Sequence, residues 1–274
     1  MDKIVVENTY FNIKDTLTCG QVFSYFDLGD KYLIRSNNKF AYVYNKADSV
    51  IIETEETQYF YNYFNLQTDY SVSYNFALTQ NVDIITKSAN FGKGIRILNQ
   101  DLLEVIISFI ISQNNNIKRI TSSINYLCEK LGEYNAKFNA YTFPSISSLA
   151  NAPRQLYINA GLGYRVDYVI GFVQDVISGK IDLKYLATLP TQKLKEQLLQ
   201  IKGIGEKVAN CILLFGFNRQ DSFPVDTWIE KVYLQDFKLP LTSRQKMTEY
   251  FINTFGIYSG IIQQYLFYYK RNNN

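Results

Sequence analysis

The sequence has no histidine among its 274 residues, and this absence removes several classes of active site. Ser-His-Asp triads, Cys-His pairs and zinc sites with histidine ligands all need an imidazole ring. Any catalysis by this chain must therefore use lysine, aspartate, glutamate, tyrosine or the backbone.

Cysteine is scarce as well. The three cysteines, Cys19, Cys128 and Cys211, are far apart in sequence and lack the close spacing of a metal site or a disulfide framework. A reducing cytoplasm is therefore the expected location.

Long hydrophobic runs and a strong excess of one charge are also missing. No run approaches the length of a membrane span, and the first residues lack the layout of a signal peptide, so we expect no membrane partner. The net charge is +3, from 28 basic and 25 acidic residues. Binding to nucleic acid would need a local basic face and backbone amides rather than a global field.

The residues that are present predict an α+β protein. Hydrophobic residues make up 47% of the chain, which is enough for one large or two to three small subdomains. Segments 31–36, 40–45 and 49–53 are rich in β-branched and aromatic residues and are separated by turn signals, which predicts an antiparallel sheet. From about residue 57 the hydrophobic period is helical. We expect an N-terminal sheet domain with a flanking helix over residues 1–95 and a helical region over residues 96–274.

Residues 201–226 combine a glycine hairpin with a lysine and an aspartate. Gly203 and Gly205 can form a tight turn that brings backbone N–H groups close to a phosphate, so an alanine at Gly203 is expected to weaken binding to any DNA. Lys207 and Cys211 are four residues apart and therefore share one helical face. Asp226 follows an extended Pro-Val pair and is expected where a loop enters the next helix.

Each of these features also has an ordinary structural explanation. A lysine on an amphipathic helix is usually a solvated charge, and an aspartate before a helix is usually its cap. Thr227 and Glu230 have the spacing of a capping box, which would make Asp226 less necessary as the cap.

In combination, these parts resemble the helix-hairpin-helix DNA glycosylase superfamily, with the hairpin at about residues 191–216. The resemblance implies that Lys207 is a nucleophile and Asp226 its electrostatic partner. It also places Lys202, Gly203, Gly205 and Trp228 at the DNA backbone. Trp228 stands where well-known members have histidine, which puts the contact made there in doubt because an indole carries no charge.

The Asn114-Asn115-Asn116 segment resembles that of the 8-oxoguanine DNA glycosylases. Asparagine is favoured at turns and caps, so the triplet alone is weak evidence. Matching segments at 94–98, 161–165 and 258–267 nevertheless occur in the order of that family. The resemblance implies that Asn114 fills the gap left by an extruded base, that Tyr164 wedges beside the orphaned base, and that Arg119 and Arg165 donate hydrogen bonds to an orphaned cytosine.

The same resemblance assigns a pocket for the damaged base. Gly20, in a Gly-Gln-x-Phe segment, would accept the N7 proton that distinguishes 8-oxoguanine from guanine. Cys211 and Phe267 would sandwich the purine, and Gln263 would meet its Watson–Crick edge. Without the resemblance, Gly20 is a turn glycine, Phe267 a core residue and Gln263 a solvated one. The last helix is expected to pack back toward the N-terminal domain.

The chemistry implied is metal-free covalent catalysis through a lysine Schiff base, followed by β-elimination. The expected partner is double-stranded DNA containing oxidised guanine, bound by a monomer. Three cysteines cannot form the four-cysteine iron–sulfur loop of some superfamily members. Whether the hairpin carbonyls bind a monovalent or divalent structural cation is left open.

Two other functions remain open from the sequence. A glycosylase for alkylated or other oxidised purines would keep Asp226 but need not use Lys207 covalently. A helix-hairpin-helix binding module would hold DNA without cutting it.

Overall fold

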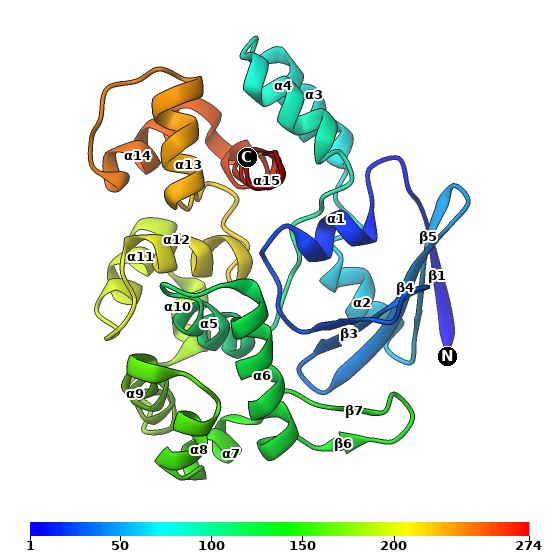
Figure 1. Ribbon diagram of the computed structural model, residues 1–274, viewed down its shortest axis with the longest axis vertical. Coiled ribbons are helices and arrows are strands. Elements are labelled where there is room, and N and C mark those ends of the chain that lie inside the picture. The colour runs from blue at the N-terminus through cyan, green and yellow to red at the C-terminus, as the bar shows by residue number, and fades with distance from the viewer. Residues whose placement is uncertain (274) are drawn as a thin grey trace.

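The computed structural model describes residues 1–273 and has the predicted α+β fold. An antiparallel sheet with its helices forms one side of the molecule, and a mainly helical region forms the other (Figure 1). The limits of the two domains, set near residue 95 from the sequence, stay a prediction.

The sheet has five antiparallel strands, three of which the sequence predicts to within one residue at either end. The spatial order is β1 (Asp2–Glu7), β5 (Ser49–Thr54), β4 (Lys39–Lys46), β3 (Tyr32–Ser36) and β2 (Tyr25–Asp27). The two strands at the edges, β1 and β2, are additional to the prediction. In β1 only Ile4 and Val6 are half-buried, and β2 has three residues, so each gives a weak sequence pattern.

Two helices pack on the sheet, α1 (Ile13–Thr18) and α2 (Thr57–Tyr63). The next two, α3 (Tyr70–Thr79) and α4 (Asp83–Phe91), lie away from it and pack against each other (Figure 1). The core under the sheet contains Phe11, Ile34, Val43, Ile52 and Phe60, all fully or almost fully buried. This core supports the loop that follows α1, where Gly20 lies.

The helical region centres on α5 (Leu102–Ile111), in which every residue from Glu104 to Ile111 is buried. A helix that is apolar all round belongs in a core, and its end therefore fixes the position of the asparagine turn that follows. The remaining helices are α6 (Ile117–Leu131), α7 (Ile146–Asn151), α8 (Arg154–Asn159), α9 (Val166–Ile177), α10 (Leu183–Thr188), α11 (Thr191–Leu199), α12 (Glu206–Phe215), α13 (Thr227–Lys231), α14 (Arg244–Phe255) and α15 (Ser259–Asn272).

Short elements complete this region. Turns of 3-10 helix cover Gly163–Arg165 and Gly256–Tyr258, and a π-helical turn covers Val232–Asp236. A small hairpin of β6 (Tyr134–Asn135) and β7 (Ala140–Tyr141) brings Phe138 onto the sheet, where its ring stacks on Phe40 at 5.0 Å. The predicted helix-hairpin-helix is formed by α11 and α12, with Pro190 directly before α11.

The last helix, α15, joins the two sides of the molecule, as expected. It packs along α4, where the rings of Phe91 and Tyr268 lie 5.2 Å apart. It also reaches α1: the Tyr268 hydroxyl donates to Asp15 Oδ1 at 2.9 Å, and Arg271 Nη2 donates to the carbonyl of Thr18. Figure 1 shows α15 between the sheet side and the other helices.

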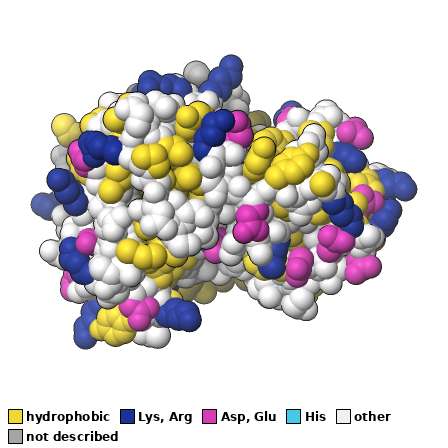
Figure 2. Space-filling model, turned by 90° about the horizontal axis from the view of Figure 1, so that it is seen from below, with side chains coloured by type: hydrophobic (Ala, Val, Ile, Leu, Met, Phe, Trp, Pro, Cys, Tyr) yellow, Lys and Arg dark blue, Asp and Glu magenta, His cyan; other side chains and the backbone are white. Residues whose placement is uncertain are grey.

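Surface charge and hydropathy agree with the composition. On the face seen in Figure 2, lysine and arginine side chains are scattered and lie beside acidic ones rather than in one basic patch. Within residues 1–273, no helix is both long enough and apolar enough to cross a bilayer.

Candidate active site

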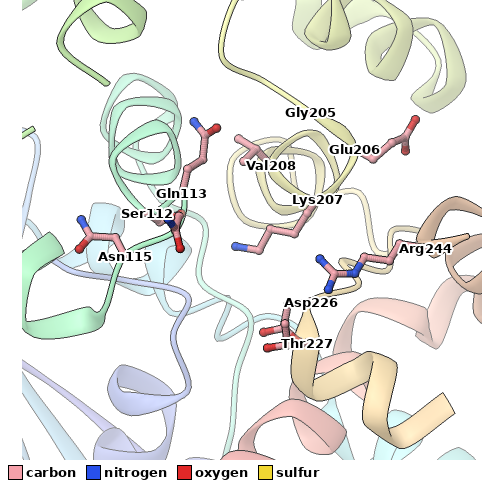
Figure 3. A pocket seen from close by; sticks show the side chains of 11 residues that line it. Ser112, Gln113, Asn115, Gly205, Glu206, Lys207, Val208, Asp226, Thr227 and Arg244 are labelled. Carbon is pink, nitrogen blue, oxygen red and sulfur yellow. The ribbon is translucent and has the colours of Figure 1, made fainter. Parts of the chain in front are cut away.

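Three adjoining cavities share Lys207 and Asp226 in their walls. The first, of about 570 Å³, lies between the asparagine turn, the start of α12 and the start of α14 (Figure 3). The second, of about 690 Å³, extends toward Gly20, Trp228 and Arg271. The third, of about 40 Å³, is enclosed by Gly20, Cys211, Gln263 and Phe267 among others. We call these the catalytic cavity, the entrance cavity and the base pocket.

Lys207 lies in the first turn of α12, as the sequence predicts. It is half-buried, and its Nζ atom lies 5.4 Å from the centroid of the Phe109 ring. Cys211 lies one turn further along the same helix, where burial raises the pKa of its thiol and the neighbouring Lys207 opposes that rise. The shared face predicted for these two side chains is therefore present.

Asp226 is the N-cap of α13. Its Oδ1 atom accepts hydrogen bonds from the backbone N–H groups of Trp228 and Ile229, both at 3.0 Å. The capping box expected from Thr227 and Glu230 is therefore wrong, because Asp226 itself takes the capping position and Glu230 pairs with Arg244. Both roles of Asp226 are compatible, since Oδ2 has no hydrogen-bond partner within residues 1–273 and the side chain lines the cavity (Figure 3).

The two hairpin glycines have different environments. Gly203 has a φ of +93°, and a β-carbon there would lie 2.4 Å from the Tyr168 ring. The expected reason for a glycine at this position, close approach of a phosphate, is therefore incomplete: the protein's own packing already excludes a side chain. Gly205 is exposed, caps α12, and has open space where a β-carbon would lie. Lys202, beside the hairpin, is exposed.

The three asparagines divide into two structural residues and one without such a role. The Asn116 side chain caps α6 by accepting from Arg119 N at 3.0 Å, and Asn115 Nδ2 donates to the carbonyl of Ile111 at 3.1 Å. Asn114 is exposed, has a φ of +45°, and lines the catalytic cavity. Its side chain makes no hydrogen bond within the described chain. Asn114, the residue that the resemblance singles out, is thus the one that local structure does not use.

The residues assigned to the opposite base lie beside this turn but differ in exposure. Arg119 is exposed, and its guanidinium has no partner among residues 1–273. Arg165 is 5% exposed and donates to three carbonyls, those of Gln113, Asn114 and Leu162. In this structure Arg165 holds the asparagine turn in place, whereas Arg119 is available to a ligand.

Tyr164 projects from the 3-10 turn before α9 and is 53% exposed. The Arg165 guanidinium lies 4.4 Å from the centroid of its ring, and its hydroxyl donates to the Gln113 carbonyl at 3.3 Å. An exposed aromatic ring supported from below suits insertion beside a base.

The base pocket is narrow. Phe267 rests on Gly20, whose φ is +86°, and a β-carbon at Gly20 would lie 3.1 Å from the Phe267 ring. Gln263 Nε2 donates to the Pro224 carbonyl at 3.2 Å, and Gln263 Oε1 accepts from Gln264. A cavity of about 40 Å³ holds a few water molecules but not a fused two-ring base. The four residues assigned to this pocket from the sequence do line one cavity, but a purine needs more room than that cavity offers.

The loop that carries Gly20 is held by Gln21, whose side chain is fully buried. Gln21 Nε2 donates to the Thr16 and Arg96 carbonyls, and Oε1 accepts from Leu98 N at 2.9 Å. These bonds tie the loop to residues 96–98 and fix the backbone beside the base pocket.

Trp228 lies in the wall of the entrance cavity and is half-buried. Lys231 Nζ lies 4.5 Å from the centroid of its ring, so a positive charge is present beside this indole although the residue itself is neutral.

Sequence reasoning missed two arginines. Arg244 lines the catalytic cavity, and Arg271 lines the entrance cavity with its carbon Cζ 5.1 Å from the Phe267 ring centroid. Neither belongs to a recognisable motif, because each is placed by the packing of its helix. The only available signal was that both are cations on helices beyond Asp226, Arg244 on α14 and Arg271 on α15.

The structure gives no cluster of metal ligands in its described part: within residues 1–273, no three cysteine, aspartate or glutamate side chains are grouped to hold a metal ion. A cation held by the hairpin carbonyls stays a prediction.

Comparison with known proteins gives consistent matches. Residues 3–106 match the family model of the 8-oxoguanine DNA glycosylase N-terminal domain, and residues 107–255 match that of HhH-GPD superfamily base excision DNA repair proteins. The N-glycosylase/DNA lyase OGG1 of Arabidopsis thaliana is 32% identical over 206 residues, which are 68% of this chain and 56% of the relative. The chain thus spans just over half the length of that protein.

Two further matches cover a larger share of the matched protein. The probable N-glycosylase/DNA lyase of Methanothermobacter thermautotrophicus is 29% identical over 231 residues, covering 76% of this chain and 72% of that protein. The crystal structure of the Clostridium acetobutylicum 8-oxoguanine glycosylase/lyase, in complex with duplex DNA containing cytosine opposite 8-oxoguanine, has a TM-score of 0.92 and 34% identity, covering 100% of this chain and 96% of that one.

These matches extend over nearly the whole sequence and agree with the geometry of the hairpin, and they show that the chain belongs to the HhH-GPD superfamily of base excision DNA repair proteins, with the N-terminal domain of the 8-oxoguanine DNA glycosylases.

Proposed function

We propose that this protein is a bifunctional DNA repair glycosylase that removes 8-oxoguanine, preferably opposite cytosine, through a lysine Schiff base and then cuts the strand by β-elimination. The observation that carries the proposal is that Lys207 and Asp226 both line the base pocket and the catalytic cavity. A nucleotide whose base occupied the pocket would therefore place its sugar beside an amine and a carboxylate.

The proposed reaction begins with extrusion of the damaged nucleotide, because its sugar carbon is inaccessible inside the duplex. The Lys207 amine attacks C1′ as the bond to N9 breaks, and the electron pair leaves with the base, which takes up a proton. Asp226 Oδ2 faces the cavity and stabilises the positive charge that develops on the sugar. Its other oxygen is held by the start of α13, which keeps the carboxylate in place.

The covalent intermediate then leads to strand cleavage. Loss of a proton from the nitrogen and opening of the sugar ring give an imine between Lys207 and C1′. Removal of a proton from C2′ expels the phosphate on the 3′ side. These steps need no metal ion and no cofactor.

Recognition of the base is proposed to come from the walls of the base pocket. The Gly20 carbonyl accepts the N7 proton that 8-oxoguanine has and guanine lacks, while guanine would present a lone pair to the same oxygen. Gln263 retains one donor and one acceptor beyond its bonds to Pro224 and Gln264, which suits a Watson–Crick edge. Phe267 and Cys211 would enclose the ring from its two faces.

The opposite strand is proposed to be read beside the asparagine turn. Asn114 would occupy the space left by the extruded base, and Tyr164 would wedge next to the orphaned one. Arg119 is the better placed of the two arginines to donate to cytosine, since Arg165 already donates to three carbonyls.

An incision assay on duplexes with 8-oxoguanine opposite each of the four bases tests this function, with borohydride added to trap the imine. Excision opposite cytosine and a trapped adduct are the expected results. Release of alkylated purines without an adduct would instead identify a monofunctional relative, and binding without release of any base would identify a DNA-binding module.

A further inference from the structure

Arg244, the first residue of α14, reaches into the catalytic cavity from the side opposite the asparagine turn (Figure 3). Among the eleven residues that line this cavity, only Lys207 and Arg244 are positively charged. A nucleotide that enters brings at least one phosphate. If Lys207 reacts as an amine with the sugar, Arg244 is the cation left to meet that phosphate.

Glu230 holds the Arg244 guanidinium in a fixed orientation. Nε and Nη2 both donate to Glu230 Oε2, at 3.0 Å and 2.6 Å. Nη1 has no partner within residues 1–273. The Arg244 side chain is 46% exposed, so its unused donors remain accessible to a ligand. A guanidinium presents its N–H groups in a rigid fork that matches two phosphate oxygens.

The same short helix places both the catalytic carboxylate and the partner of this arginine. Asp226 caps the start of α13, and Glu230 lies one turn later on that helix. Trp228, between them, carries no charge. The position of the Arg244 donors relative to Asp226 is therefore set within a single turn of helix.

We propose that Arg244 binds a backbone phosphate of the extruded nucleotide and that Glu230 is its positioning residue. The inference rests on the proposed function, because it assumes that a nucleotide enters this cavity. It adds to that function a phosphate-binding pair, Arg244 and Glu230.

The first test measures the salt dependence of binding to a duplex that contains a tetrahydrofuran abasic analogue, which requires no turnover. Arg244→Ala should weaken binding roughly tenfold at moderate salt, as for loss of a hydrogen bond from a charged donor. The slope of log K against log salt should become less steep by about 0.9, because one fewer phosphate is neutralised. Arg244→Lys should restore the slope but only part of the affinity, since it keeps the charge and loses the fork.

The second test identifies the phosphate. Neutral methylphosphonate is placed on either the 5′ or the 3′ side of the abasic analogue, and binding is measured for the unmodified protein and for Arg244→Ala. At the contacted phosphate, the methylphosphonate should weaken DNA binding by the unmodified protein. It should leave DNA binding by Arg244→Ala nearly unchanged. Equal losses in both proteins at both positions would overturn the proposal.

Glu230→Gln tests positioning. It keeps Arg244 and its charge, so the salt slope should stay that of the unmodified protein while affinity falls about threefold and the preference for one methylphosphonate position weakens. A salt slope reduced as far as in Arg244→Ala would show that Glu230 does not act through orientation.

Lys3→Ala is the matched control. Lys3 pairs with Glu53 at 2.8 Å and lies on an edge strand of the sheet. As in the pair of Arg244 and Glu230, the basic side chain is more exposed than the acidic one, 60% against 19%. Its removal should change neither slope nor affinity. Melting temperatures show whether each variant folds, and Arg244→Gln replaces Arg244→Ala if the alanine variant does not.

Failure of the arginine assignment can be distinguished from failure of the proposed function. If the unmodified protein excises 8-oxoguanine while Arg244→Ala keeps the full salt slope, the arginine assignment is wrong and the function stands. If the unmodified protein neither excises nor forms an adduct, the function itself is wrong.

Discussion

The base pocket and the catalytic cavity share Lys207 and Asp226 but differ greatly in size. The base pocket has about 40 Å³ and is lined by Phe267 and by buried side chains such as Gln263. The catalytic cavity has about 570 Å³ and is lined mainly by polar residues. Without DNA, the protein thus has ample room where the sugar and phosphate are proposed to bind and little room where the base is proposed to bind. Entry of a purine would therefore displace more of the surrounding side chains than binding of the backbone would.

The largest effect is expected from a substitution of Lys207, which lines both cavities. Lys207→Gln should lower base release and borohydride trapping on the order of a thousandfold or more, because it deletes the nucleophile. Binding to lesion DNA should be retained, since the hairpin is intact. Lys193→Gln, an exposed lysine on α11, is the control and should leave trapping unchanged. Undiminished strand cleavage by Lys207→Gln would refute the nucleophile assignment.

The next prediction concerns the base pocket alone. Phe267→Ala should slow 8-oxoguanine excision by roughly 5- to 150-fold, because stacking of a base on an aromatic ring contributes about 1–3 kcal/mol. Affinity for DNA with an abasic analogue should hardly change, since no base enters. Phe91→Ala removes another ring that packs against α15, and it should not alter excision. Equal loss on both DNA substrates would mean that the cavities do not act separately.

The third prediction concerns the DNA strand opposite the lesion and the role of Arg119 in reading it. Excision opposite cytosine should exceed that opposite adenine by roughly tenfold to a hundredfold, because an unpaired charged donor costs about 1.5–3 kcal/mol. Arg119→Ala should reduce this ratio more than it slows excision opposite cytosine in single-turnover kinetics. Lys118→Ala, its exposed neighbour, should weaken binding equally for every opposite base. A ratio near one for the unmodified protein would reject the assignment.

The smallest effect sharpens the description of the hairpin. Gly205→Ala should weaken binding to all duplex DNA about two- to tenfold without lowering stability, because open space faces that position. Gly203→Ala should instead lower the free energy of unfolding by about 1–3 kcal/mol, since it combines a positive φ with a clash against Tyr168. Thermal unfolding and binding isotherms distinguish the two. A stable Gly203→Ala protein would contradict the packing explanation.

The parts of the molecule that could be predicted from sequence depend on residues close together in the chain. The hairpin, Lys207 and Cys211 follow from spacing within one helix, and the three central strands follow from local composition. The short strands β1 and β2 could not be recognised, because their pairing partners, rather than their own residues, define them.

The rest depends on contacts between distant segments. The packing of Gly203 involves Tyr168, which lies on α9. Whether Asp226 or Thr227 caps α13 depends on backbone geometry that the capping-box pattern alone did not decide. Phe267 closes the base pocket only because α15 lies against the loop after α1. Sequence reasoning named most of the residues that line the cavities, without Arg244 and Arg271, but not which of them already have protein partners.

The attachment of α15 to α1 has a consequence for the order of folding. Thr18 and Arg271 are 253 residues apart, as are Asp15 and Tyr268, and these bonds fix the wall of the base pocket. Domains fold from the N-terminus during synthesis, and contacts of long sequence separation form slowly. The sheet and the hairpin with its lysine can therefore fold on the ribosome before the segment that closes the base pocket has been made. Of the elements that the structure describes, the helix that completes the proposed base pocket is thus the last to be made.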